Sequence, residues 1–247
     1  MTTRRVIAIT GAGGALGSAI SQRLAAEPDT DLVLSDLSEA TLAATVAALG
    51  DPDGAVETTL ADVSQFSDVE AVVATAVDRF GHLDVLISNA GVLATNGRIH
   101  NLTDEDWERS FRINVMGAVN GIRAAVGVMR PQGTGSIILT ASVAGMTAWS
   151  HSGPYCATKA AVIQTAKVAA VEYARDGIRV NCVCPGTFRS AIHEGLPPEA
   201  LDPIAARHPL GLGSATDIAG AYSYLASDAS RWTTGSAIVV DGGYSAP

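Results

Sequence analysis

Cysteine is scarce in this sequence, which has only Cys156, Cys182 and Cys184 among its 247 residues. Three thiols are too few for a disulfide framework, and no group of His and Cys residues has the spacing of a zinc site. Cys182 and Cys184 are two residues apart, so in a strand both thiols would lie on the same side. We therefore expect small packing residues in a reducing compartment and no metal.

Basic runs and long hydrophobic stretches are also missing. The formal net charge is −9 and Lys and Arg form no stripe, so neither nucleic acids nor anionic membranes are expected as partners. The apolar run before Gly11 is too short for a signal peptide or a membrane-spanning helix. These absences predict a cytoplasmic protein.

The composition that is present suits a globular α/β protein, with 47% hydrophobic residues, 17% charged residues and 25 glycines. Short β-branched runs alternate with longer amphipathic stretches, a pattern typical of repeated βαβ units around a parallel sheet. The predicted strands cover residues 5–10, 32–35, 56–60, 85–88, 136–141, 179–183 and 237–240. The predicted helices cover residues 16–25, 39–49, 66–79, 104–129, 153–175 and 216–226.

No linker, repeat or low-complexity segment interrupts this alternation, which predicts a single domain over residues 1–247. The least regular stretch runs from about 185 to 214, where several prolines prevent a long helix. Loops of that length in compact domains are often lids or binding loops, so we expect the substrate-binding loop there.

A glycine-rich turn directly follows the first predicted strand and opens the first predicted helix. Four glycines within residues 11–17 allow the backbone to approach a pyrophosphate, whose charge is met by free N–H groups at the helix start. Asp36 closes the second strand, where a carboxylate accepts ribose hydroxyls and repels a 2′-phosphate. Asp36 is alternatively a helix N-terminal acid beside a capping Ser38. Without a nearby cation, the pattern favours NAD over NADP.

Tyr155 and Lys159 are four residues apart in a predicted helix, so the phenol and the ammonium share one helix face. A free tyrosine holds its proton to about pH 10, and a cation nearby lowers that pKa. Such a phenol exchanges protons with an alcohol or a ketone near neutral pH. The alternative is an exposed Tyr and a solvated Lys on an ordinary helix.

Taken together, the motifs of this sequence resemble those of the short-chain dehydrogenase/reductase family from about Val6 to Tyr244. The resemblance implies a single doubly wound Rossmann-type domain, with a seven-stranded parallel sheet flanked by helices on both faces. The residues that carry it, besides the glycine turn, are Asp62, Val63, Asn89, Ala90, Gly91, Asn114, Ser142, Tyr155, Lys159, Pro185 and Gly186.

The resemblance also implies a cofactor site. The sequence departs from the family pattern at Ala15, where a glycine is usual, and at Ser190, where a threonine is usual. We expect the cofactor to bind despite both changes. The implied cofactor residues are Gly11, Gly14, Ala15, Leu16, Gly17, Asp36, Leu37, Asp62, Val63, Asn89, Ala90, Gly91, Tyr155, Lys159, Pro185, Gly186, Phe188 and Ser190.

The implied chemistry is hydride transfer between NADH and a carbonyl carbon, with Tyr155 as the proton donor to the oxygen. Lys159 is expected to lower the pKa of Tyr155 and to hold the nicotinamide ribose. Ser142 is expected to bond the substrate oxygen, and Asn114 to hold a water that connects Lys159 to solvent. Ser142 as a turn former and Asn114 as an ordinary helix residue are the alternatives.

Segments that face the substrate in this family carry mostly apolar side chains here, which predicts a secondary alcohol or ketone that is apolar and cyclic or aromatic. His151 is alternatively a surface histidine. The family is commonly tetrameric, so a homotetramer is expected. The implied pocket residues are Leu93, Met146, Trp149, His151, Phe188, Ile192 and Leu196.

Two other functions are weighed against this one. A 3-oxoacyl-thioester reductase acting on acyl carrier protein belongs to the same family, but it generally uses NADPH and presents cations to its carrier, which Asp36 and the acidic charge argue against. A non-catalytic NAD-sensing binding protein has no need of a proton relay. The complete set of Ser142, Tyr155, Lys159 and Asn114 argues against the sensor.

Overall fold

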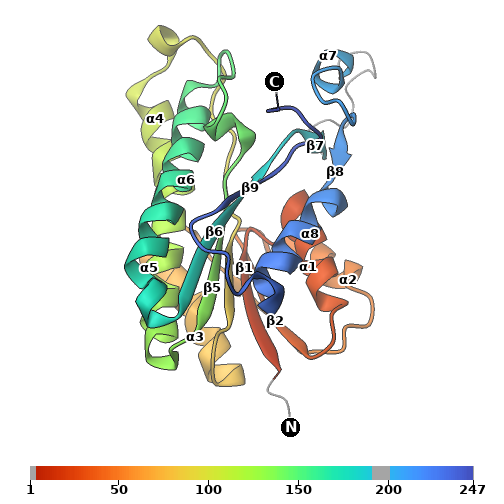
Figure 1. Cartoon of the computed structure of the whole chain (residues 1–247), viewed down its shortest axis with the longest axis vertical. Helices are drawn as coiled ribbons and strands as arrows, with labels where there is room; N and C mark the ends of the chain where they lie inside the picture. Colours follow the sequence, from red (N-terminus) through yellow and green to blue (C-terminus); the bar gives the residue numbers. More distant parts are fainter. Residues whose placement is uncertain (1–3, 191–200, 247) are drawn as a thin grey trace.

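A computed structural model describes residues 4–190 and 201–246 of the chain. Seven parallel strands form its central sheet in the order β3-β2-β1-β4-β5-β6-β9 (Figure 1). The chain order reverses between β1 and β4, where a doubly wound sheet opens a crevice at the carboxyl ends of its strands. The predicted fold is confirmed. The strands are β1 (Arg5–Thr10), β2 (Thr30–Asp36), β3 (Val56–Leu60), β4 (Val85–Ser88), β5 (Gly135–Thr140), β6 (Ile178–Pro185) and β9 (Ala237–Val240).

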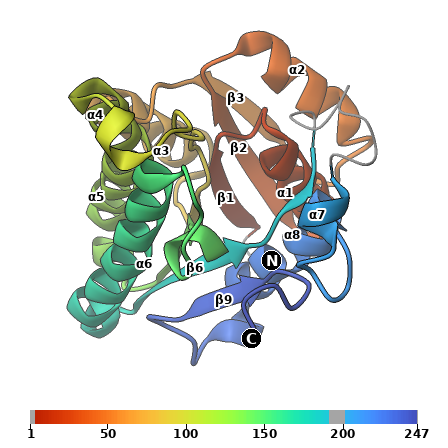
Figure 2. The same cartoon turned by 90° about the horizontal axis from the view of Figure 1, so that it is seen from above.

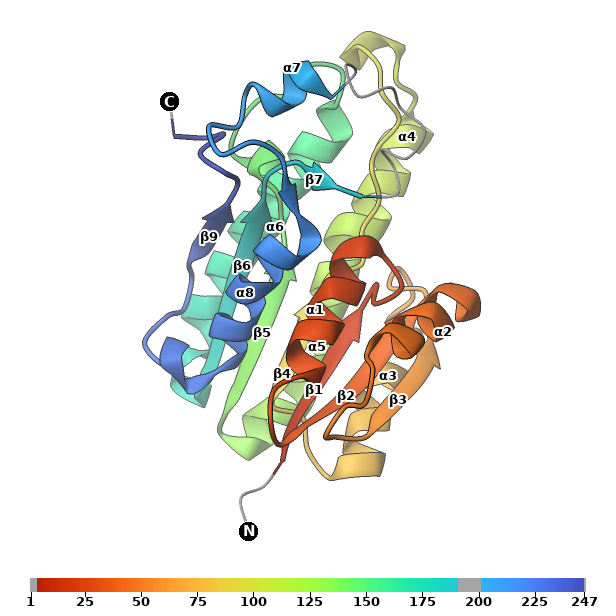
Figure 3. The same ribbon diagram turned by 90° about the vertical axis from the view of Figure 1, so that its right-hand side faces the viewer.

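Helices cover both faces of the sheet, as Figures 1 and 3 show. One face packs against α1 (Ala15–Ala25), α2 (Glu39–Ala48) and α8 (Ala215–Ala226), and the other against α3 (Phe66–Phe80), α5 (Met116–Gln132) and α6 (Gly153–Tyr173). The central strands are therefore buried on both sides, which explains their nearly continuous apolar sequence.

The predicted helix over residues 104–129 is present and extends to Gln132, but it contains a π-helical turn. Its parts are α4 (Asp104–Ser110), the π-turn η2 (Phe111–Val115) and α5, which follow one another without a gap. Thr103 caps α4 in a reciprocal pair with Asp106, which fixes where this unit begins. A π-turn inserts an extra residue into the helix and often marks a functional position. Further short helices are η1 (Ile99–Asn101), η3 (Val143–Gly145), η4 (Ala174–Asp176) and η7 (Asp228–Ser230).

The described parts of the irregular stretch, residues 185–190 and 201–214, lie above the carboxyl end of the sheet (Figure 3). They contain a two-stranded parallel ribbon of β7 (Phe188–Arg189) and β8 (Gly213–Ser214), and a short helix α7 (Asp202–Ala205). The predicted pocket residues Ile192 and Leu196 lie outside the described residues. Seen from above in Figure 2, α7 lies near α8 and across the sheet from α4.

Candidate active site

A cavity of about 790 Å³ lies at the carboxyl ends of the strands. Every predicted cofactor residue lines it, from the glycine turn to Ser190. Ser142, Tyr155 and Lys159 line the same cavity, as do the predicted pocket residues Leu93 and Trp149. Met146 and His151 do not line it, and His151 instead contacts Ser150 on the exposed surface. Residues from widely separated motifs thus meet in one ligand-sized space.

The glycine turn leaves no room for side chains at its two ends. Gly11 has φ of 66°, and a Cβ added there would lie 2.6 Å from the Cα of Ala90. A Cβ at Gly17 would lie 2.0 Å from the carbonyl oxygen of Gly11. Ala15 begins α1, so its methyl group fits a normal helical position and lines the cavity. The turn keeps the bare backbone that a pyrophosphate site needs.

Asp36 lies at the end of β2 with both carboxylate oxygens turned toward backbone amides. Its Oδ2 accepts from the amide of Gly13 at 3.0 Å and its Oδ1 from that of Ser38 at 3.3 Å. Ser38 itself caps α2. The carboxylate is therefore held against the glycine turn and at the cavity wall, beside Leu37, which is 71% exposed. Ser38 therefore caps α2 as one interpretation expects, and the role of Asp36 as a ribose ligand stays a prediction.

Lys159 is almost fully buried, and its position corrects one expectation. Its Nζ donates to the carbonyl oxygen of Thr140 at 2.7 Å and lies 5.8 Å from the centre of the Tyr155 ring. Burial lowers the pKa of Lys159 to about 8. For Tyr155, burial raises the pKa, and a hydrogen bond with Ser142 lowers it only in part. The pKa of Tyr155 therefore moves up and not down as expected from Lys159, because desolvation is the largest cause and Ser142, not Lys159, supplies the opposing one.

Ser142 connects the turn after β5 to the candidate proton donor. Its Oγ accepts from the amide of Ala144 and so caps η3, as the turn-forming interpretation requires. It is also hydrogen-bonded to Tyr155. One hydroxyl therefore forms the turn and also contacts the candidate proton donor, while its bond to a substrate oxygen stays a prediction.

Asn114 lies in the π-turn with its side chain 3% exposed. Its Oδ1 accepts from the amide of Val92 at 2.8 Å, and its Nδ2 donates to the carbonyl oxygen of Val92 and to Thr158 Oγ1. Gly91 lies between Asn114 and Lys159, since a Cβ there would be 3.1 Å from Asn114 Oδ1 and 3.4 Å from Lys159 Nζ. The Asn114 side chain does not line the cavity. Its hydrogen bonds hold the backbone of Val92, which does line it.

Sequence reasoning missed several residues of this site. Thr140 holds Lys159 through its carbonyl, while its Oγ1 donates to Asn89 Oδ1 and contacts the hydroxyl of the buried Tyr222. The position of Thr140 at the carboxyl end of β5 could have indicated a site residue, because ligands bind at that end of such sheets. Thr187 lines the cavity, and its amide donates a hydrogen bond to His208. No local sequence pattern predicts this contact, because the two residues lie in separate segments.

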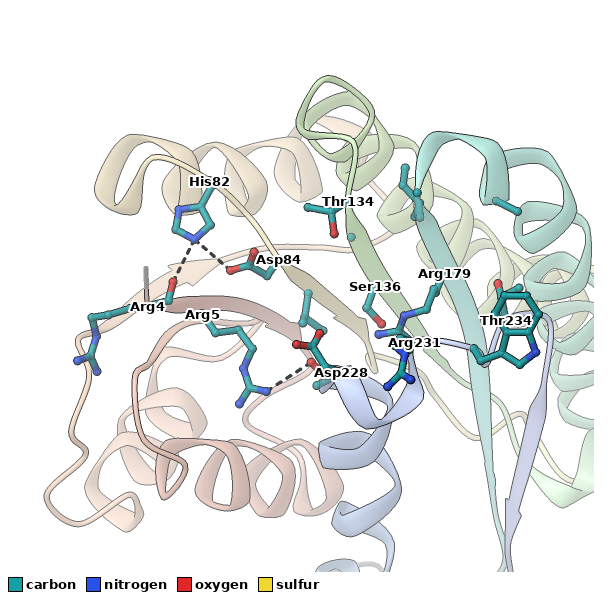
Figure 4. A pocket seen from close by; sticks show the side chains of 17 residues that line it. Arg4, Arg5, His82, Asp84, Thr134, Ser136, Arg179, Asp228, Arg231 and Thr234 are labelled. Carbon is teal, nitrogen blue, oxygen red and sulfur yellow. Dashed lines mark hydrogen bonds and ion pairs between the residues drawn. The ribbon is translucent and has the colours of Figure 1, made fainter. Parts of the chain in front are cut away.

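A second cavity, of about 750 Å³, lies at the opposite end of the strands (Figure 4). It is lined by charged residues, and several of them already have partners. Figure 4 shows His82 directed at Asp84, and their side chains are 3.0 Å apart. Arg5 pairs with Glu27, and Arg179 donates to the carbonyl oxygen of Leu225. None of the sequence motifs reaches this cavity, so the site at the carboxyl ends is the candidate active site.

Comparisons with known proteins agree with this geometry. A family model described as enoyl-(acyl carrier protein) reductase matches residues 11–245. Levodione reductase from Leifsonia aquatica is 36% identical over 99% of this chain and 95% of its own length. Cis-4-hydroxycyclohexanecarboxylate dehydrogenase from Sinomonas cyclohexanicum is 36% identical over 98% and 97%. The crystal structure of a levodione reductase superposes with a TM-score of 0.94 at 34% identity, covering 100% of this chain and 99% of that one.

The structure of an NAD⁺-bound xylitol dehydrogenase also superposes, with a TM-score of 0.91 at 28% identity over 98% of this chain and 100% of that one. The chain therefore belongs to the short-chain dehydrogenase/reductase family. It is an oxidoreductase that interconverts a secondary alcohol and a ketone with a nicotinamide cofactor.

Proposed function

We propose that this enzyme uses NAD(H) to interconvert a cyclic, largely apolar secondary alcohol and its ketone. The observation that carries the proposal is that Ser142, Tyr155 and Lys159 share one cavity with the glycine turn and Asp36. When bound, the nicotinamide ring supplies or accepts the hydride. The bare backbone at Gly11 and Gly17 fits the pyrophosphate of such a cofactor.

In the proposed mechanism Tyr155 donates its phenolic proton to the carbonyl oxygen during reduction and recovers it during oxidation. Its raised pKa keeps the phenol protonated at neutral pH, as a proton donor requires. Ser142 bonds the same substrate oxygen through its hydroxyl. Lys159 holds the nicotinamide ribose, and the carbonyl of Thr140 fixes its ammonium in place. Asn114 supports this group by fixing the Val92 backbone.

The preference for NAD over NADP rests on Asp36. Its carboxylate stands at the cavity wall where an adenosine ribose would lie, and a 2′-phosphate would meet its charge without a compensating cation from Leu37 or Ser38. The structural relative with bound NAD⁺ carries the same cofactor that we assign here.

The substrate class follows from the wall beside Tyr155. The Trp149 ring stacks on the Tyr155 ring with centres 6.1 Å apart, and Leu93 and Phe188 also line the cavity. A flat apolar wall suits a ring. Relatives named for levodione, for cis-4-hydroxycyclohexanecarboxylate and for a dichlorocyclohexadienediol support a cyclic substrate. Met146 and His151, which lie away from the cavity, are left out of this pocket.

The acyl carrier protein reductase is the second candidate, and the description of the matching family model favours it. An acidic chain of net charge −9 with Asp36 at its cofactor site is a poor partner for an acidic carrier and for NADPH. The NAD sensor is the third candidate. The Ser142–Tyr155 hydrogen bond at the cavity argues for catalysis instead.

We also infer that the protein is a cytoplasmic homotetramer. Exposed apolar residues on neighbouring helices support assembly, with Val168 and Val171 on α6 and Met116 on α5. Figures 1 and 2 show these helices side by side on one face. Exposed apolar side chains such as Val168 and Val171, one turn apart on α6, are typical of an interface between subunits. None of the described helices is long and apolar enough to span a membrane.

The test is a panel of cyclic secondary alcohols and ketones, assayed at pH 7.5 with NAD(H) and NADP(H) by nicotinamide absorbance. We expect turnover with at least one ring substrate and a kcat/KM at least tenfold higher with NAD(H). Asp36→Ala should reduce that preference, while Glu39→Ala, which removes a nearby exposed carboxylate outside the cavity, should keep it. Better turnover of an acyl thioester with NADPH would favour the second candidate. Tight NADH binding without turnover would favour the sensor.

A further inference from the structure

His208 is a buried histidine whose hydrogen bonds define its protonation state. The residue is 3% exposed and follows α7. Its Nδ1 lies 2.8 Å from the carbonyl oxygen of Ile204, which only accepts, so Nδ1 carries a hydrogen. The amide of Thr187 donates to its Nε2 at 3.2 Å, so Nε2 carries none. The pair of bonds therefore requires the neutral imidazole with its proton on Nδ1.

The bond to Thr187 fixes the middle of the cofactor loop. Thr187 and its neighbours Gly186 and Phe188 line the cavity. Gly186 is held by the carbonyl oxygen of Val240, and Phe188 pairs with Gly213 in the β7–β8 ribbon. The His208 imidazole holds the Thr187 amide between the bonded residues Gly186 and Phe188. It thereby helps to set the position of this backbone in the cavity wall.

The imidazole also contacts the first of several aromatic rings that pack one against the next as far as Tyr155. Its ring centre is 4.8 Å from that of Tyr244, and the Tyr244 ring meets Trp149 edge-on at 6.2 Å. Trp149 in turn stacks on Tyr155. The segment that carries His208 is fastened to the same C-terminal region, since the amide of Leu210 donates to the carbonyl oxygen of Gly242. His208 is thus packed between the cofactor loop and the catalytic wall.

Tyr244 and Asp241 lie near this imidazole, and Arg207 lies over the ring of Tyr244. The guanidinium of Arg207 lies 4.7 Å from the centre of the Tyr244 ring, on the same segment as His208. Asp241 lies on the C-terminal segment. Burial raises the pKa of Asp241, but hydrogen bonds from Ser245 and Gly243, together with nearby His208, hold it below its usual range. An ionised Asp241 can stabilise an imidazolium, so protonation of His208 does not require unfolding.

We propose that His208 is a positioning residue for the cofactor: its neutral imidazole fixes the Thr187 amide, and protonation releases that amide and weakens cofactor binding. A protonated Nε2 is a donor and cannot accept from the Thr187 N–H. Cofactor affinity therefore falls on acidification. The inference rests on the proposed binding of NAD(H) in this cavity.

Two substitutions separate the two hydrogen bonds of the imidazole. His208→Gln places a carbonyl oxygen near the Nε2 position, where it accepts from Thr187 at every pH. His208→Asn places an NH₂ near Nδ1, which keeps the bond to Ile204 and removes the acceptor for Thr187. The measurement is the NADH dissociation constant by fluorescence from pH 8.0 to 5.5, with the melting temperature of each variant followed alongside.

At pH 7.5 we expect wild-type affinity in His208→Gln and about five- to tenfold weaker binding in His208→Asn, as for one lost hydrogen bond. The wild type should weaken toward the His208→Asn value at pH 5.5, while both variants stay flat. An equal acid loss in His208→Gln, or wild-type affinity in His208→Asn, overturns the role of His208. Absence of NADH binding by the wild type instead overturns the cofactor assignment itself. If His208→Asn fails to fold, the pH dependence of the wild type and of His208→Gln still decides.

Discussion

At the scale of single residues, burial shifts the pKa values of Tyr155 and Lys159 in opposite directions. It disfavours charge on both, so it raises the pKa of Tyr155 and lowers that of Lys159 to about 8. At neutral pH the phenol of Tyr155 is therefore protonated. Lys159 is mostly charged, because neutral pH lies about one unit below its pKa. The phenol is therefore prepared to give a proton, which suits reduction of a ketone.

The first prediction concerns that proton. Tyr155→Phe keeps the ring and its stacking on Trp149, so NADH should bind with nearly wild-type affinity. Loss of the hydroxyl should lower kcat by about 10²–10⁴-fold, the usual contribution of a general acid. Steady-state kinetics and NADH fluorescence titration measure the two effects separately. A kcat within a few-fold of wild type would contradict the assigned role.

The second prediction concerns pH. Because burial places the pKa of Lys159 near 8, the ammonium is lost as pH rises through that value, and kcat/KM for ketone reduction should fall there. The pKa of Tyr155 is raised above that of an ordinary phenol, so Tyr155 does not produce this loss. Lys159→Arg keeps a cation to far higher pH. Its absolute activity should be lower, but its alkaline loss near pH 8 should disappear. An unchanged alkaline limb in this variant would refute the assignment to Lys159.

At the scale of elements, the π-turn between α4 and α5 is the feature that sequence periodicity did not reveal. The strands and most helices were predictable because apolar spacing reports which face is buried. The π-turn does not follow from such spacing, since it depends on Asn114 bonding across to Val92 and Thr158. Asn is a poor residue for a helix interior, and that was the available hint.

The third prediction tests this turn. Asn114→Ala leaves the amide and carbonyl of Val92 without their partner, and should lower the free energy of unfolding by about 2–3 kcal/mol and reduce kcat strongly. Asn120→Ala is the matched control, because Asn120 is equally buried on α5 and donates to Val63. It should cost about 1 kcal/mol and leave kcat nearly unchanged. Urea unfolding and kinetics distinguish them, and equal effects of both variants would contradict a special role for the turn.

At the scale of the whole molecule, the face formed by α5 and α6 carries exposed apolar side chains. Val171 is 82% exposed and Val168, one turn earlier, is 48% exposed. The same helix carries Tyr155 and Lys159 toward the cavity, so the surface patch and the site are two sides of one element. Assembly on this face would also support the site from behind.

The fourth prediction tests assembly. Val171→Glu places a charge in the patch and should shift a tetramer to smaller species by analytical ultracentrifugation, with a lower melting temperature. Val46→Glu on α2, an exposed valine on the other side of the sheet, should leave the assembly unchanged. A wild type that sediments as a monomer, or dissociation by both variants alike, would refute this interface.

The sequence by itself determined what depends on neighbours along the chain. The alternation of strands and helices, the glycine turn, and Tyr155 four residues before Lys159 are local patterns with local physical causes. Only the tertiary structure decided how the groups are held and charged. Hydrogen bonds join Lys159 to Thr140, Asn114 to Val92 and His208 to Thr187, and each pair is far apart in the sequence. Desolvation and hydrogen bonding act through space, and distances in space are set only when the chain has folded.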